Sequence, residues 1–128
     1  MILRSLLVDD NSRFLAAARE LLEREGIEVV GVASTIDEAE RLAGALRPDV
    51  CLVDIDLGDE SGFELARRLV AADDGCPRVV LISAYPERDF ADMIADSPAL
   101  GFVAKPEISA ARIRAMLDGD AAGETARG

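Results

Sequence analysis

The stretch VCLVDIDL, at residues 50–57, joins a short apolar run to two carboxylates. Val50 to Val53 is apolar at every position and not at every second one, which indicates a β-strand covered on both faces. Short apolar runs of the same kind occur at residues 3–8, 27–32, 79–82 and 100–103. Because strands buried on both faces are typical of parallel sheets between layers of helices, we predict an α/β fold with five buried strands.

Segments with helical periodicity separate these runs. Apolar side chains recur on one helical face between residues 14 and 22. A weaker helical pattern follows at residues 87–95, and a further helix is expected at residues 109–117. Thr35 with Glu38, and Ser61 with Glu64, have capping-box spacing and predict the starts of two more helices. The sequence therefore predicts a doubly wound parallel sheet flanked by five helices, as one domain over residues 1–118. A disordered tail is expected over residues 119–128.

The composition excludes several classes of function. The chain has 128 residues and 14 basic against 25 acidic side chains, a net charge of −11, so we expect it to repel nucleic acid. It has no apolar run as long as a membrane span, so a cytoplasmic protein without membrane contact is expected. The two cysteines, Cys51 and Cys76, lie in apolar surroundings and are predicted to be buried free thiols. The chain contains no histidine, so histidine-based catalysis within the chain is excluded.

Polar side chains follow four of the five predicted strands. Asp9 and Asp10 follow the first, Asp54 ends the third, Ser83 ends the fourth and Lys105 follows the fifth. Because right-handed crossovers bring the carboxyl ends of parallel strands to one edge, we expect these five side chains to meet there. Each alone could simply cap a helix or a turn, but all five at strand ends are harder to explain by chance.

This set of side chains suits phosphoryl transfer. Clustered carboxylates raise each other's pKa unless a cation joins them, and Mg²⁺ prefers such oxygen ligands. A carboxylate can also attack phosphorus to form an acyl phosphate. Lys105 would then neutralise charge on the phosphoryl oxygens, and Ser83 would donate a hydrogen bond to one of them. The sequence therefore predicts a site in which Asp54 takes a phosphoryl group beside Mg²⁺.

Four short motifs carry a resemblance to a known family. They are Leu7-Val8-Asp9-Asp10, Val53-Asp54-Ile55-Asp56-Leu57, Ile82-Ser83-Ala84 and Phe102-Val103-Ala104-Lys105-Pro106. In this order and spacing they resemble the receiver domain of two-component response regulators, over about residues 3–117. The resemblance implies a flavodoxin-like fold with the strand order 2-1-3-4-5.

The resemblance also implies roles at the metal site. Asp54 would be the phosphoacceptor and would contact Mg²⁺ together with Asp9, Asp10 and the backbone carbonyl of Asp56. The side chain of Asp56 and that of Tyr85, each two residues past a site residue, would tune the rate at which water removes the phosphoryl group.

Further implied roles concern the last two strands. Ser83 and Lys105 would contact the phosphoryl group, and Phe102 would be the aromatic switch residue. The Lys105–Pro106 peptide would be cis, which proline makes accessible. Two positions depart from the family: Gly58 stands where proline is common, so a more mobile loop is expected, and Glu60 adds charge near an acidic pocket.

The expected partners follow from the same resemblance. Because the chain lacks histidine, the phosphoryl group would come from a histidine kinase or a phosphotransfer protein. The receiver would not be an enzyme, and it would signal to a downstream protein target or an output domain. A homodimer through the fourth and fifth helices is also possible within the family.

Several alternatives stay open. We expect a stand-alone receiver, but the chain also resembles receivers joined to helix-turn-helix transcription factors. A degenerate receiver that takes no phosphoryl group is a further alternative. Asp54-Ile55-Asp56 after an apolar strand also resembles the nucleophile motif of haloacid-dehalogenase-like phosphatases, although those enzymes carry it on the first strand.

Overall fold

A five-stranded parallel sheet forms the centre of the computed structural model, which describes residues 2–72, 75–76 and 78–127. The strands are β1 (Arg4–Val8), β2 (Glu28–Ala33), β3 (Val50–Asp54), β6 (Val79–Ser83) and β7 (Gly101–Ala104). Their order is β2-β1-β3-β6-β7, and every neighbouring pair is parallel. This confirms the predicted order 2-1-3-4-5, because the remaining strands, β4 (Asp56–Leu57) and β5 (Glu60–Ser61), form a separate small sheet.

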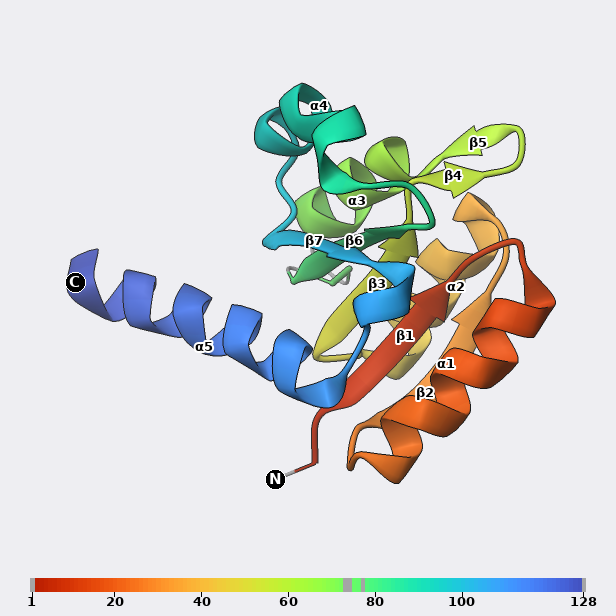
Figure 1. The fold of residues 1–128 in the computed structure, drawn as a ribbon, viewed down its shortest axis with the longest axis horizontal. Helices are drawn as coiled ribbons and strands as arrows, with labels where there is room; N and C mark the ends of the chain where they lie inside the picture. The colour runs from red at the N-terminus through yellow and green to blue at the C-terminus, as the bar shows by residue number, and fades with distance from the viewer. Residues whose placement is uncertain (1, 73–74, 77, 128) are drawn as a thin grey trace.

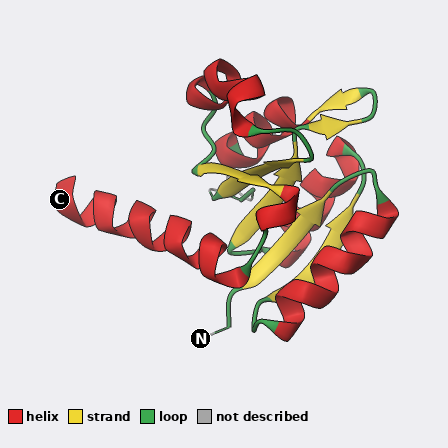
Figure 2. Cartoon of the chain, in the orientation of Figure 1, coloured by secondary structure: helices red, strands yellow, loops and turns green. Residues whose placement is uncertain are grey.

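Helices cover both faces of the sheet (Figures 1 and 2). The helices are α1 (Ser12–Arg24), α2 (Ile36–Leu46), α3 (Gly62–Ala71), α4 (Ala91–Asp96) and α5 (Ala110–Arg127). A 3₁₀ turn, η1 (Glu87–Phe90), precedes α4. One buried cluster joins the sheet to α1 and α5, and a second joins it to α2, α3 and α4.

Strand β1 illustrates why both faces must be covered. Leu6 and Val8 belong to the cluster under α2 and α3, whereas Leu7 belongs to the cluster under α1 and α5. All three are at most 1% exposed. Because side chains alternate between the faces of a strand, a fully apolar run is stable only between two helical layers.

The predicted helix starts are confirmed. Thr35 Oγ1 accepts a hydrogen bond from the backbone N–H of Glu38 at 3.2 Å, and Ser61 Oγ accepts one from that of Phe63, also at 3.2 Å. Asn11 caps α1 by accepting from the N–H groups of Arg13 and Phe14. These side chains satisfy donors that a helix leaves free at its first turn.

A short antiparallel hairpin follows β3 and was not predicted. Strand β4 (Asp56–Leu57) pairs with β5 (Glu60–Ser61), and Gly58 begins the two-residue turn between them with a φ of +71°. Glycine at this first turn position is favoured in tight hairpins. Gly58 therefore forms a defined turn, where the sequence suggested a more mobile loop.

Helix α5 continues to Arg127, through residues for which a disordered tail was predicted. Among residues 110–119, whose side chains the structure describes, the buried ones are Ala110, Ile113 and Leu117. Beyond them the helix runs away from the sheet (Figure 1). The domain boundary at residue 118 stays a prediction. Cys51 and Cys76 are buried and unbonded, as predicted. Within the described residues, no helix combines the length and the apolar character needed to span a bilayer.

Candidate functional site

The predicted site residues meet at the carboxyl edge of the sheet. Asp9 follows β1, Asp54 and Ser83 are the last residues of β3 and β6, and Lys105 follows β7. Together with Asp10 and four neighbours they line a pocket of about 170 Å³. The four neighbours are Asn11, Asp56, Ala84 and Tyr85.

Three carboxylates form the acidic part of this pocket. One oxygen from each of Asp9, Asp10 and Asp54 lies within 4.8 Å of the others. Asp9 is fully buried and Asp54 is 5% exposed, whereas Asp10 is exposed. Asp9 Oδ1 accepts from the N–H of Asn11 at 2.9 Å, but its Oδ2 has no well-aligned hydrogen-bond donor. A buried carboxylate oxygen without such a donor is stabilised by a nearby cation.

Lys105 is the positive group of the site. Its Nζ lies 2.6 Å from Asp9 Oδ2 and 2.8 Å from Asp54 Oδ2, and 4.3 Å from the ring centroid of Phe14. Burial disfavours its charge, but the bonds to Asp54 and Asp9 outweigh burial and raise the pKa of Lys105. Phe14 was predicted only as an apolar residue of the first helix, because its sequence spacing gave no sign of this cation–π contact.

Asp54 has an unusual protonation equilibrium for an aspartate. Burial raises its pKa from 3.8 to about 6, and the charge of Asp9 adds to this effect. The hydrogen bond from Lys105 and that from the backbone N–H of Asp56, at 2.9 Å to Oδ1, oppose the increase. Even with these bonds, the Asp54 carboxyl keeps its proton to a higher pH than an ordinary aspartate does.

The expected cis bond between Lys105 and Pro106 is wrong, because this peptide is trans. Lys105–Glu107 forms a 3₁₀ turn, η2, with Pro106 in its first turn. Proline fits such a position in the trans form, since its fixed φ suits a helical start and it has no N–H to satisfy. Lys105 reaches both aspartates from this turn.

The remaining predicted site residues lie in different surroundings. Tyr85 is 62% exposed at the rim of the pocket, and its N–H donates to Ser83 Oγ at 3.0 Å. The Asp56 side chain is exposed beside it. Phe102 is 6% exposed and packs in the cluster under α3 and α4, so it does not line the pocket.

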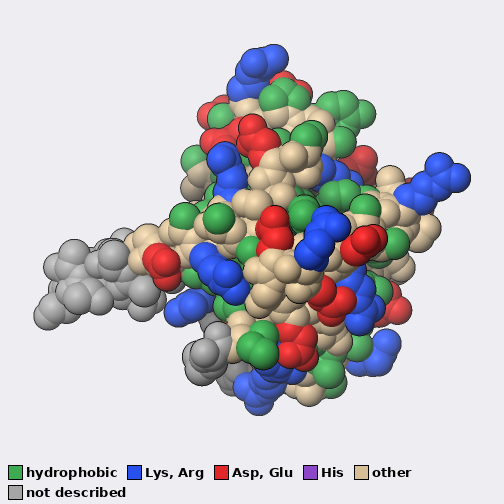
Figure 3. All heavy atoms as spheres, turned by 60° about the horizontal axis from the view of Figure 1, so that its bottom comes forward, with side chains coloured by type: hydrophobic (Ala, Val, Ile, Leu, Met, Phe, Trp, Pro, Cys, Tyr) green, Lys and Arg blue, Asp and Glu red, His purple; other side chains and the backbone are tan. Residues whose placement is uncertain are grey.

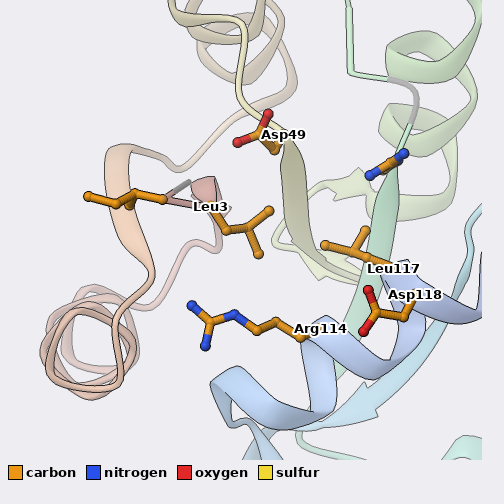
Figure 4. A pocket seen from close by; sticks show the side chains of 7 residues that line it. Leu3, Asp49, Arg114, Leu117 and Asp118 are labelled. Atoms are coloured by element: carbon orange, nitrogen blue, oxygen red, sulfur yellow. The ribbon is translucent and has the colours of Figure 1, made fainter. Parts of the chain in front are cut away.

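A larger hollow, of about 300 Å³, lies at the opposite edge of the sheet (Figure 4). Its lining residues Leu3, Asp49 and Arg78 precede strands, whereas Arg114 and Leu117 lie on α5. Two arginines and two aspartates line it, so it carries no excess charge. In Figure 3, basic and acidic side chains are interspersed over the visible face. We therefore assign the chemistry to the carboxyl edge.

Comparison with known proteins identifies the family of the chain. The sequence pattern of the response regulator receiver domain matches residues 5–118. The chain belongs to this family. The receiver is 28% identical over 103 residues to the transcriptional regulatory protein PdtaR of Mycobacterium tuberculosis, covering 80% of this chain and 49% of PdtaR. It is 30% identical over 105 residues to the response regulator GacA of Pseudomonas aeruginosa, covering 81% of this chain and 49% of GacA. The receiver thus spans about half the length of these relatives.

Solved receiver structures share the fold. The signal receiver domain of a modulated diguanylate cyclase from Desulfovibrio desulfuricans G20 has a TM-score of 0.79 and 29% identity, with all of both chains covered. A response regulator protein from Burkholderia pseudomallei has a TM-score of 0.76 and 31% identity, covering 98% of this chain and 72% of that one. That structure is described as holding a phosphorylated aspartic acid, a calcium ion and citrate.

Proposed function

We propose that this receiver accepts a phosphoryl group on Asp54 from a phosphohistidine of a partner protein. The observation that carries the proposal is the buried Asp54 carboxylate, which has Lys105 at 2.8 Å and two further carboxylates within 4.8 Å. In the transfer, an Asp54 oxygen forms a bond to phosphorus while the bond from phosphorus to the imidazole nitrogen of the donor breaks. The donor must be a histidine kinase or a phosphotransfer protein, because this chain has no histidine.

The donor set fits Mg²⁺. Asp9, Asp10 and Asp54, with the backbone carbonyl of Asp56, would hold the ion, and one oxygen of each carboxylate lies within 4.8 Å of the others. Bound there, Mg²⁺ would supply positive charge to offset that of the phosphoryl oxygens. The Burkholderia pseudomallei regulator, with its phosphorylated aspartic acid and calcium ion, supports a divalent cation beside this residue.

Other side chains would recognise the phosphoryl group once it is attached. Lys105 would pair with one of its oxygens. Ser83 Oγ accepts from the N–H of Tyr85, which leaves its own hydrogen free to donate to a second oxygen. Tyr85 and the Asp56 side chain, at the rim, would limit the approach of the water that hydrolyses the acyl phosphate.

The product would be a changed surface, in keeping with a signalling module and not an enzyme. A new dianionic group beside Ser83 and Lys105 would shift the loops that follow β6 and β7. We infer that this change controls contact with another protein or with an attached output domain. PdtaR is described as a transcriptional regulator and is about twice as long as the matched region, which favours an output of that kind.

Intact-mass measurement after incubation with acetyl phosphate and MgCl₂ tests the proposal. The wild-type receiver should gain one phosphoryl mass, EDTA should abolish the gain, and Asp54→Asn should show none. Asp56→Asn is the matched control, because it removes a neighbouring carboxylate but keeps the backbone carbonyl. A gain that persists in Asp54→Asn, or no gain in the wild type, would overturn the assignment.

A further inference from the structure

Glu60 makes a contact that links the β4–β5 hairpin to the start of α2. Its Oε1 accepts a hydrogen bond from the backbone N–H of Ile36 at 2.9 Å, across 24 positions of sequence. Ile36 is the first residue of α2. That N–H has no acceptor within its own helix, so the carboxylate satisfies a free donor and also lies at the positive end of the helix dipole.

The helix start is otherwise capped from its own chain segment. Thr35 Oγ1 accepts from the N–H of Glu38, and Glu38 Oε1 accepts from the N–H of Ser34 at 2.8 Å. Glu60 therefore adds the only contact to this first turn, among the hydrogen bonds of the described residues, that comes from the β4–β5 hairpin. This contact joins β5 to the start of α2.

The hairpin carries groups of the proposed metal site. Its residue Asp56 donates an N–H to Asp54, and a Cβ on Gly58 would lie 3.4 Å from Asp10 Oδ2. The base of the hairpin is fixed by Gly62, whose N–H donates to Ile55 at 2.8 Å. Its free end is the part that could move relative to Asp10.

These contacts connect the chain segments that carry Asp9 and Asp54. The N–H of Asp9 donates to Ala33 O, at the end of β2, at 3.0 Å, and α2 begins shortly after β2. Glu60 joins the start of α2 to β5, and β5 pairs with β4, which follows Asp54. Removing the Glu60 contact would break this connection.

We propose that Glu60 is a positioning residue for the metal site: by capping α2 it holds the hairpin, and with it Asp56, at the position that Mg²⁺ binding requires. The inference rests on the proposed function, because it takes the acidic pocket to be a Mg²⁺ site. Leu57 also anchors the hairpin through the core, where it is 3% exposed. If the Glu60 contact contributed nothing, Leu57 alone would hold the hairpin in place.

Two substitutions separate the effect of the length of the Glu60 side chain from the effect of its charge. Glu60→Asp keeps the negative charge but shortens the side chain by one methylene, so it loses the contact with Ile36. Glu60→Gln keeps the length and an acceptor oxygen but loses the charge. If Glu60 acted only through its charge, Glu60→Gln would weaken Mg²⁺ binding more than Glu60→Asp. If Glu60 acts through its contact with Ile36, Glu60→Asp would weaken Mg²⁺ binding more.

Mg²⁺ titration of the three proteins decides between these cases. Calorimetry gives the dissociation constants, and Tyr85 offers a second signal, because it lines the pocket as the only tyrosine of a chain without tryptophan. We expect Glu60→Asp to bind about fivefold more weakly than wild type, the factor equivalent to the ~1 kcal/mol of a helix cap, and Glu60→Gln to stay nearer to wild type. At saturating Mg²⁺, the rate of phosphorylation by acetyl phosphate should recover in Glu60→Asp.

The outcomes are distinguishable from failure of the proposed function. Equal binding by all three proteins, or weaker binding by Glu60→Gln than by Glu60→Asp, overturns the role of Glu60 alone. A wild-type receiver that binds no Mg²⁺ overturns the metal site and this inference together. Amide exchange at Ile36 in the metal-free proteins checks the cap directly: it should accelerate in Glu60→Asp and not in Glu60→Gln.

Discussion

Replacing Asp54 by asparagine should stabilise the metal-free receiver at neutral pH. The native Asp54 carboxyl has a pKa of about 6, against 3.8 for an unperturbed aspartate. The folded state therefore binds this proton more tightly than the unfolded state does. Stability falls as pH rises from about 4 to about 6, and the whole loss is present above pH 6. Asparagine resembles the protonated acid in shape and cannot ionise, so Asp54→Asn escapes this loss.

The size of the effect follows from the pKa difference. One pKa unit corresponds to about 1.36 kcal/mol. The difference between 3.8 and about 6 therefore means that ionisation of Asp54 lowers the free energy of unfolding by about 3 kcal/mol above pH 6. This pKa already includes the opposing attraction of Lys105. For a domain of this length, about 3 kcal/mol corresponds to a melting temperature higher by roughly 10 °C. At pH 4 the difference should fall below about 1 kcal/mol.

Urea denaturation in EDTA, followed by circular dichroism at pH 4 and pH 7.5, measures this difference. Asp59→Asn is the matched control, because the exposed Asp59 lies in the hairpin turn and its loss removes the same charge. A stability difference between wild type and Asp54→Asn that stays constant over this pH range would refute the reasoning. A wild type that is more stable than Asp54→Asn at pH 7.5 would also refute the reasoning. In that case the attraction of Lys105 would offset the whole free-energy cost of ionising Asp54.

Three further substitutions test the surroundings of Asp54. Lys105→Met removes the cation that lowers the pKa of Asp54, so that pKa should rise above about 6 in a ¹³C NMR titration, and phosphorylation at pH 7 should slow. Gly62→Ala would place a Cβ in steric conflict with the backbone oxygen of Asp54, so urea denaturation should show a loss of about 2 kcal/mol or more in the free energy of unfolding. An unchanged stability would contradict this contact. Glu25→Ala removes the acceptor of the Ala110 N–H, which lies 2.7 Å from Glu25 Oε1 at the start of α5. We expect the free energy of unfolding to fall by about 1–2 kcal/mol and amide exchange at Ala110 to become faster. Unchanged exchange would argue against this cap.

The sequence was sufficient for the sheet and for the set of side chains at its edge. Runs such as Val50 to Val53 are apolar throughout, and this pattern has few interpretations other than a strand buried on both faces. Once the strands are parallel, their ends meet, so the proximity of Asp9, Asp54 and Lys105 follows from topology without side-chain detail. The helix caps at Thr35 and Ser61 were predictable because their partners lie within three residues.

Features that depend on distant partners were not predictable. Glu60 and Ile36 are 24 residues apart, and Glu25 and Ala110 are 85 apart, so no local pattern signals either contact. The strands of the β4–β5 hairpin have two residues each, too short to show alternation. The Lys105–Pro106 peptide was expected to be cis because of the family resemblance, whereas the local 3₁₀ turn accommodates the trans form.

The burial of Phe102 has a consequence for the switch role that the family resemblance implies. The ring is 6% exposed and lies in the cluster that Phe90 and Ile94 pack against. Exposing a phenylalanine side chain to water costs roughly 2–3 kcal/mol, so the outward rotamer would be occupied by only a few per cent of molecules at most. Phenylalanine also has no hydroxyl that water or a neighbour could hold in the outward position. A switch that acts only by drawing this ring inward would therefore change its position in only a few per cent of molecules.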